Sequence, residues 1–400
     1  MSTVDIEVGL SEEDAAIRDV AHQYAEEVLR PAGIAMDRMV DPADTIGPDS
    51  PIWNVIEKYH QIGLGGIAYD DDMDPYRKAR LMAVVNEELA WGDVGLSITV
   101  GLSGFHQPWV QQTGDAALIE RFCDADNPTI GCWALTEPDH GSDTVALTEP
   151  GFSNPDLKAN CTATKDGDSY IIRGQKAAWV SNGPIADMAV LFCTLDQSQG
   201  FKGGGVFLVP LDLPGVQRPR PLDKLGQRSL NQGEIYFDDV RIPENYMALG
   251  PDLYAIGLEM MLAHANAGMG QIFVGIARAA YEHALAYAHE RVQGGVPIIE
   301  HQSVKSRLFK MFTKVEAARA LARRVAYFNG GGAPSIAHCI ASKTFITNTA
   351  FEVASDALQI FGGNGVSREY PMEKLLRDAR AALIEDGCNE VLAIVGGSRL

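Results

Sequence analysis

The chain has 400 residues, of which 46% are hydrophobic, so it can bury more than one core and is expected to fold into two or three packed domains. Its formal net charge of -20 argues against nucleic acid as a partner, because binding to a phosphate backbone depends on clustered Lys and Arg. An acidic balance still permits an anionic cofactor, since a few local cations and backbone N–H groups can hold phosphates.

The first residues of the chain are acidic and contain no basic segment followed by an apolar run, so no secretory signal or transit peptide is expected. No stretch reaches ~18 uninterrupted apolar residues, the length that crosses a membrane. The six cysteines are widely spread and form no C-x-x-C pair, which argues against a zinc site and a disulfide framework. We therefore expect a cytoplasmic protein without a membrane partner or a metal.

Residues 1–128 are predicted to form a helical domain. Ser11 and Asp14 have the spacing of a capping box, which marks the start of a first helix. One apolar stripe at helical spacing follows before Pro31, formed by Ile17, Val20, Ala21, Tyr24 and Val28. Residues 76–125 continue the helical spacing, and a polar segment at 124–128 stops it.

Residues 129–245 contain short strand-like runs separated by turn residues, so a middle β-domain is predicted. Asp166-Gly167 indicates a hairpin turn, and Pro243 closes the last strand-like run. Residues 246–400 return to a helical pattern, with a glycine turn at 330–332. The predicted helices cover roughly 251–290, 300–328, 334–360 and 371–400.

The segment WALTEPDHGSD (133–143) joins an apolar run to a turn that contains hydroxyl groups and Gly141. Such a loop can direct N–H and O–H donors at a planar acceptor or at a phosphate. Thr, Pro, Gly and Ser also form ordinary turns for conformational reasons. By itself, this segment leaves both interpretations open.

Four further segments follow this loop along the chain. They are GQKAAWVSNG (174–183), KLGQR (224–228), EHQ (300–302) and QIFGGNG (359–365), the last with Tyr370-Pro371 and Arg377-Asp378. In this order the five segments resemble the signature of the acyl-CoA dehydrogenase family, and they cover most of the chain. The resemblance implies an α+β fold with an N-terminal helical domain (1–128), a middle β-domain (129–245) and a C-terminal four-helix domain (246–400).

The same resemblance places FAD between the last two domains. The flavin and its phosphates would be lined from the β-domain by Leu135, Thr136, Gly141, Ser142, Trp179 and Ser181, and Cys388 and Glu390 are carried over as further cofactor contacts. An indole can cover the flavin ring and exclude water, while a hydroxyl can hydrogen-bond flavin N5. The structural alternative for Trp179 is an anchor of the β-domain core.

In this family the neighbouring subunit holds the ADP half of FAD. The matching positions here are Arg291, Gln302, Gln359, Gly362 and Gly363. Arg291 offers a fixed charge to the pyrophosphate, and the two glycines permit close backbone approach. A helix C-cap followed by a turn also explains residues 362–365. The resemblance implies at least a homodimer, and homotetramers are common in the family.

The family usually has a catalytic glutamate directly before a glycine near the C-terminus. Counting without a gap from 362–365 through Arg377-Asp378 puts Asp386 at this position, directly before Gly387. A shift of one residue would make Glu385 the base instead. A third interpretation is a purely structural Asp386 that caps a terminal turn.

Two further positions depart from the family pattern. Asn266 stands where an arginine is usual, and Gly294 stands where an aromatic residue often packs near the cofactor. Both departures imply that the electrostatics and shape of the site differ from those of a typical fatty acyl-CoA enzyme. His140 and His264 lie near these positions and are interpreted as structural or solvent-facing residues.

The resemblance implies α,β-dehydrogenation of an acyl-CoA to a 2-enoyl-CoA. Asp386 would take the α-proton, flavin N5 would accept the β-hydrogen as hydride, and an electron-transfer flavoprotein would receive the electrons. Two alternatives come from other functional classes. One is a redox-neutral, flavin-containing lyase or desulfinase-like enzyme, and the other is a non-catalytic subunit of a heteromeric dehydrogenase.

Overall fold

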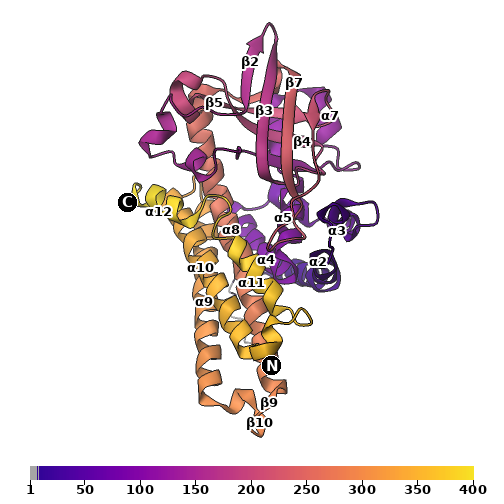
Figure 1. The fold of residues 1–400 in the computed structure, drawn as a ribbon, viewed down its shortest axis with the longest axis vertical. Coiled ribbons are helices and arrows are strands. Elements are labelled where there is room, and N and C mark those ends of the chain that lie inside the picture. The colour runs from indigo at the N-terminus through magenta and orange to yellow at the C-terminus, as the bar shows by residue number, and fades with distance from the viewer. Residues whose placement is uncertain (1–6, 8) are drawn as a thin grey trace.

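The computed structural model describes residue 7 and residues 9–400. The first six residues and residue 8, on which the expectation of no targeting signal partly depends, lie outside the described residues. Figure 1 shows an elongated molecule with the sheet domain at one end, the long C-terminal helices at the other and the N-terminal helices beside their junction. None of the helices in the described ranges is long and apolar enough to cross a membrane.

The N-terminal part is helical up to Phe122. Its helices are α1 (Glu12–Tyr24), α2 (Arg30–Asp37), α3 (Pro51–Gln61), α4 (Pro75–Gly92), α5 (Val94–Ser103), α6 (Gln107–Thr113) and α7 (Ala116–Phe122). The predicted capping box is confirmed, because the Ser11 hydroxyl accepts from the Asp14 amide while the Asp14 carboxylate accepts from the Ser11 amide.

The predicted apolar stripe is corrected at one position. Val20 is 43% exposed and does not belong to the buried face. The structure also shows that the helical path continues beyond Pro31 to Asp37, through a π-helical turn at Ala25–Leu29. This wider turn accommodates a proline ring that would clash with the preceding turn of a regular α-helix.

The middle part is a sheet with the strand order β6-β7-β3-β2-β4-β5-β8, and β1 pairs in parallel with β4. The strands are β1 (Gly131–Ala134), β2 (Thr162–Asp166), β3 (Ser169–Ser181), β4 (Met188–Thr194), β5 (Gly204–Pro210), β6 (Val216–Gln217), β7 (Gln232–Pro243) and β8 (Met247–Leu249). The predicted hairpin is confirmed, because Asp166 pairs with Ser169 and Gly167 has a φ of 65°.

The C-terminal part is a bundle formed by α8 (Pro251–Glu290), α9 (Gln302–Gly330), α10 (Ile336–Phe361) and α11 (Met372–Ala381), followed by α12 (Asn389–Gly397). A small hairpin, β9 (Val292–Gln293) and β10 (Val296–Pro297), connects α8 to α9. The continuous helix predicted at 371–400 is wrong, because residues 382–388 interrupt it. Asp386 and Gly387 have φ values of 51° and 90°, which a right-handed helix cannot contain.

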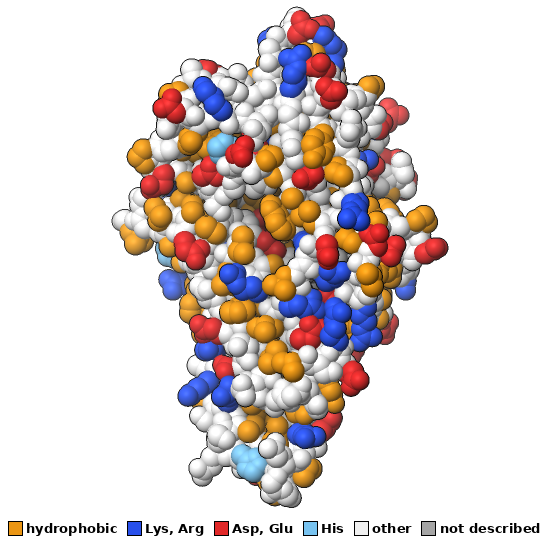
Figure 2. All heavy atoms as spheres, viewed as in Figure 1, with side chains coloured by type: hydrophobic (Ala, Val, Ile, Leu, Met, Phe, Trp, Pro, Cys, Tyr) orange, Lys and Arg blue, Asp and Glu red, His pale blue; other side chains and the backbone are white. Residues whose placement is uncertain are grey.

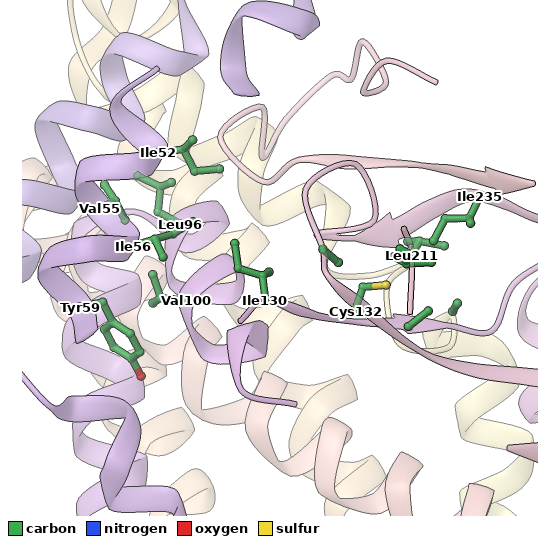
Figure 3. Close-up of a cluster of buried hydrophobic side chains, with 14 of the residues drawn as sticks. Ile52, Val55, Ile56, Tyr59, Leu96, Val100, Ile130, Cys132, Leu211 and Ile235 are labelled. Atoms are coloured by element: carbon green, nitrogen blue, oxygen red, sulfur yellow. The ribbon is translucent and has the colours of Figure 1, made fainter. Parts of the chain in front are cut away.

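The N-terminal helices and the sheet share one hydrophobic core. Figure 3 shows this cluster, with Ile52, Val55, Ile56 and Tyr59 from α3, Leu96 and Val100 from α5, and Ile130, Cys132, Leu211 and Ile235 from the sheet domain. A second cluster fills the bundle and includes Ala90 of α4 and Val94 of α5. Since these cores join different parts of the chain, close packing fixes the parts relative to one another.

Buried ion pairs also join α4 to the bundle. Glu87 is 1% exposed and accepts hydrogen bonds from Arg278 at 3.0 Å, Arg319 at 2.8 Å and Arg323 at 2.8 Å. Burial alone would raise the pKa of Glu87, but the three guanidinium groups hold it well below its usual range. The carboxylate therefore stays ionised and keeps α4 against α8 and α9.

Candidate active site

A cavity of about 1010 Å³ lies between the sheet domain, α5, α8 and the segment around Asp386. The face shown in Figure 2 is hollowed at the middle of the molecule, with hydrophobic side chains around the hollow and acidic side chains inside it. Seven of the residues predicted to serve the flavin or the reaction line this one cavity. They are Leu135, Thr136, Gly141, Ser142, Trp179, Ser181 and Asp386.

The first wall of the cavity is formed by the end of β1 and by β3. Lys176 of β3 is buried and donates to the Leu135 carbonyl at 2.9 Å and to the Glu137 carboxylate at 2.7 Å. The Ala177 amide donates to the Thr136 carbonyl at 2.8 Å. These contacts hold Leu135 and Thr136 beside Trp179, whose indole is 59% exposed. Trp179 is therefore a wall of the cavity and not an anchor of the β-domain core.

The loop after β1 joins this wall to the opposite side of the cavity. The His140 imidazole lies between the Asp143 carboxylate at 2.8 Å and the Lys158 carbonyl at 3.0 Å. Burial opposes charge on His140, but these two acceptors raise its pKa above the ordinary value. The Ser142 hydroxyl accepts a hydrogen bond from the Cys388 amide at 2.9 Å. His140 thus shapes the loop, and Ser142 connects it to the segment that carries Asp386.

The opposite wall contains two adjacent carboxylates, because both Glu385 and Asp386 line the cavity. Burial raises the pKa of Glu385 to about 7, and repulsion from Asp386 adds to the effect. Burial also raises the pKa of Asp386, while Lys343 opposes the rise. The Gln227 amide group donates to Glu385 at 3.2 Å, which occupies part of that carboxylate. Asp386 does not cap α12, because the N-cap residue is Cys388.

Three residues that line the cavity have a buried polar atom without a partner. Within the described part of the chain, the Trp133 indole N–H, the Ser97 hydroxyl and the His60 Nε2 atom are buried and have no hydrogen-bond partner. All three residues line the cavity. Since buried polar groups are normally hydrogen-bonded, a polar ligand is expected in this space.

Sequence reasoning missed several contributors to the site. Lys343 of α10 is fully buried and donates to the Gly387 carbonyl at 2.8 Å and to the Asn389 side-chain oxygen at 2.8 Å. It falls on the same helical stripe as the buried residues Cys339, Thr347 and Ala350. A lysine on an apolar stripe is unusual and was the available signal. The walls contributed by α3 and α5 carried no such signal.

The two departures from the family pattern have different surroundings. Asn266 is fully buried in α8, where its amide donates to the Leu262 carbonyl at 2.8 Å and lies 3.5 Å from the Asp386 carbonyl. It therefore touches the backbone of the segment that carries the carboxylates. Gly294 has a φ of 67° in the turn between β9 and β10 and does not line the cavity.

The structure does not place the predicted ADP-binding residues in this cavity. Arg291, Gln302, Gln359, Gly362 and Gly363 are all exposed. They lie at the other end of the bundle, where Tyr287 near the end of α8 stacks on Phe361 at the end of α10 with ring centroids 4.0 Å apart. Gly362 is also the C-cap of α10, with a φ of 59°. Cys388 and Glu390 do not line the cavity either.

The three-part fold encloses a cavity walled by an open indole and two carboxylates, an arrangement typical of an enzyme that binds a planar cofactor. Comparison with known proteins specifies the class. Residues 132–240 match the middle domain of acyl-CoA dehydrogenases, and residues 258–400 match their C-terminal domain. The chain is 31% identical to the short-chain specific acyl-CoA dehydrogenase of Megasphaera elsdenii, an alignment that covers 95% of this chain and 96% of that protein.

Two solved structures have the same fold. The butyryl-CoA dehydrogenase of Megasphaera elsdenii superposes with a TM-score of 0.83 at 28% identity, covering 98% of this chain and 99% of that one. A chain from the structure of the electron transferring flavoprotein of Acidaminococcus fermentans also gives a TM-score of 0.83, at 29% identity and with 98% of both chains covered. This chain belongs to the acyl-CoA dehydrogenase family, whose members are FAD-dependent oxidoreductases acting on CH–CH groups.

Proposed function

We propose that this chain converts an acyl-CoA thioester to the 2-enoyl-CoA, with Asp386 as the base that removes the α-proton. The observation that carries the proposal is the position of Asp386 on the cavity wall, directly before Gly387 and in the same cavity as Thr136 and Trp179. Glu385 is the weaker base candidate, because the Gln227 amide already occupies part of its carboxylate.

The residues of the cavity fit a flavin. The open indole of Trp179 offers a flat apolar surface in the cavity, against which a ring system can pack. Thr136 and Ser181 place hydroxyl groups in the same cavity, and the unpartnered Trp133 N–H is one further donor. When bound, FAD supplies the acceptor, flavin N5, for the β-hydrogen that leaves as hydride.

The surroundings of Asp386 suit the removal of a weakly acidic proton. A thioester α-proton is far less acidic than a solvated carboxyl group, so the base has to be strengthened by burial. Burial does raise the pKa of Asp386. An aspartate has a shorter reach than a glutamate, and a misplacement of ~1 Å can cost about a hundredfold in rate. The substrate α-carbon therefore has to lie closer to the backbone of the 382–388 segment than it would with a glutamate.

Assembly and the electron acceptor are part of the same proposal. The exposed Arg291, Gln359 and Gly363 lie far from the flavin cavity within one chain, which supports their use by a second copy. We therefore propose a homodimer or homotetramer in which each copy completes the cofactor site of another. An electron-transfer flavoprotein is the proposed acceptor, and the likeness to a chain from an electron transferring flavoprotein structure supports it.

Anaerobic titration of the purified protein with acyl-CoA tests the proposal. The protein is expected to purify yellow, and butyryl-CoA, octanoyl-CoA or cyclohexanecarbonyl-CoA should bleach the flavin and yield a 2-enoyl-CoA. A product formed while the flavin returns to its oxidised state would favour a redox-neutral lyase. A folded protein that retains no FAD would favour a non-catalytic subunit.

A further inference from the structure

We propose that Lys343 is a positioning residue for the reaction, which holds the turn that carries Asp386 and keeps a positive charge beside its carboxylate. The inference rests on the proposed function. Lys343 lies in the middle of α10 and is fully buried, although lysine is among the residues that are almost never buried without a partner. Its partners are therefore expected to explain why it is there.

The hydrogen bonds of Lys343 join both sides of residue 388. Its ammonium group donates to the Gly387 carbonyl at 2.8 Å and to the Asn389 side-chain oxygen at 2.8 Å. Asn389 is held in turn by the Thr347 hydroxyl, to which its amide group donates at 3.1 Å. One side chain of α10 thus fixes the end of the 382–388 segment and the start of α12.

The turn needs such an anchor because of its backbone conformation. Asp386 and Gly387 both have positive φ values, 51° and 90°. For a residue other than glycine this conformation is strained and persists only when the surrounding contacts hold it. The Asn266 amide contributes little, because it lies 3.5 Å from the Asp386 carbonyl. The closer restraints are Lys343, the bond from the Cys388 amide to Ser142 and the bond from the Asn389 amide to the Leu383 carbonyl at 3.0 Å.

Lys343 affects the pKa of Asp386 without forming a hydrogen bond to its carboxylate. Its hydrogen bonds go to Gly387 and Asn389 and not to the Asp386 carboxylate, which remains available to a substrate. Burial lowers the pKa of Lys343 to about 8, while Asp386 and Glu385 oppose the decrease. The side chain is therefore still charged at neutral pH. This positive charge opposes the rise in the pKa of Asp386 that burial causes.

The other charged or titratable groups around this position do not replace Lys343. Cys388 and Glu390 also act on Lys343, and neither is a cation. Lys224 interacts with Glu385 and Asp378, and its ammonium group donates to the Leu230 carbonyl and the Gln232 side chain. His264, Arg377 and Arg380 border the same cavity, but Lys343 is the cation that affects the pKa of Asp386.

Two substitutions distinguish the hydrogen bonds of Lys343 from its positive charge. Lys343→Met removes the charge and both hydrogen bonds, whereas Lys343→Gln removes the charge but keeps an amide donor. Lys314→Met is the matched control, because it removes a cation on α9 that pairs with Glu352 and lies outside the cavity. For each protein we would measure FAD content, the melting temperature, deuterium exchange of residues 383–392, and the rate of flavin reduction by butyryl-CoA or octanoyl-CoA against pH.

We expect Lys343→Met and Lys343→Gln to raise the pH midpoint of flavin reduction by about one pH unit or more, the effect of losing an opposite charge nearby. The base would then ionise at higher pH, so the rate at a pH below the parental midpoint should fall at least about tenfold and recover as the pH rises. Exchange of residues 383–392 should be fastest in Lys343→Met and intermediate in Lys343→Gln. Lys314→Met should change neither quantity.

A lower melting temperature with an unchanged pH midpoint and unchanged exchange at 383–392 would show that Lys343 is only structural, and would overturn the proposal. If the parent protein reduces no flavin with either acyl-CoA, it is the proposed function that fails. The exchange measurement still decides whether Lys343 anchors the turn, because it requires no turnover. Unchanged exchange in Lys343→Met would then overturn the proposal by itself.

Discussion

Asp386 and Glu385 are neighbours in the chain, but they have different surroundings. Asp386→Asn keeps the size of the side chain and removes the proposed base, so flavin reduction should slow by about 10² to 10⁴ while FAD and acyl-CoA binding persist. Stopped-flow measurement of flavin bleaching under anaerobic conditions checks this expectation. Asp386→Glu should keep partial activity, because it retains a carboxylate but extends it by one methylene group further into the cavity.

Glu385→Gln is the matched control for Asp386→Asn, because it removes the adjacent carboxylate and leaves Asp386 in place. It should reduce flavin far faster than Asp386→Asn does. The opposite order, with Asp386→Asn at the parental rate and Glu385→Gln inactive, would identify Glu385 as the base. If neither variant slows the reaction, the proposed mechanism is wrong.

At the scale of elements, the packing of α8 against α4 depends on a single glycine. A Cβ atom at Gly275 would lie 2.4 Å from the Glu87 carbonyl oxygen and 2.7 Å from the Trp91 backbone nitrogen. Both atoms belong to the backbone of α4, so the two helices would have to separate. We therefore expect Gly275→Ala to lower the free energy of unfolding by about 1 to 3 kcal/mol, the usual cost of overpacking a core.

Gly268→Ala provides the comparison within the same helix. A Cβ atom at Gly268 would meet nothing within 4 Å, so the substitution should be neutral or stabilise α8 by up to about 1 kcal/mol through helix propensity. Denaturant midpoints of the two variants and the parent test the pair. Equal changes in the free energy of unfolding at the two positions would show that α4 and α8 can separate at little cost to accommodate a Cβ atom at Gly275.

The interruption between α11 and α12 is the element on which prediction from sequence failed. The pattern over 371–400 predicted one helix, because apolar spacing reports a helical face and says little about a short break within it. Gly387 was a visible signal for the break. The positive φ of Asp386 was not, since the contacts next to it, from Lys343 to Gly387 and from Cys388 to Ser142, involve residues that lie far away in the chain.

At the scale of the whole molecule, the separation of the exposed Arg291 from the cavity that Asp386 lines predicts an assembly in which the second copy is required. Arg291→Ala should weaken FAD retention by about 1.5 to 3 kcal/mol, the scale of a charge-assisted hydrogen bond. The dissociation constant of FAD and the molar mass in solution check this expectation. Arg121→Ala, at an exposed arginine of α7 that pairs with Asp212, is the control.

A folded, monomeric protein that retains FAD through purification would contradict the proposed assembly. Unchanged FAD affinity in Arg291→Ala, in a protein that remains at least dimeric, would instead remove only Arg291 from the cofactor site. The two outcomes therefore test the oligomer and the residue separately.

The sequence by itself determined the family, the three-part α+β fold and the need for FAD, all of which the comparisons confirm. Local patterns, such as the capping box at Ser11 and the hairpin at Gly167, predicted elements of the fold. The order of five motifs along the chain predicted the family and its cofactor. The sequence also named Trp179, Thr136 and Asp386, which meet in one cavity, although their roles remain predictions.

Only the tertiary structure decided what surrounds these residues. Lys343 is separated by 43 positions from Asp386 in the chain, and no spacing rule connects a lysine in one helix with a turn beyond the next. The walls from α3 and α5 and the unpartnered Ser97 and Trp133 became apparent in the same way. The physical reason is that periodicity and turn chemistry act between near neighbours, whereas a cavity and its electrostatics depend on which distant segments pack together.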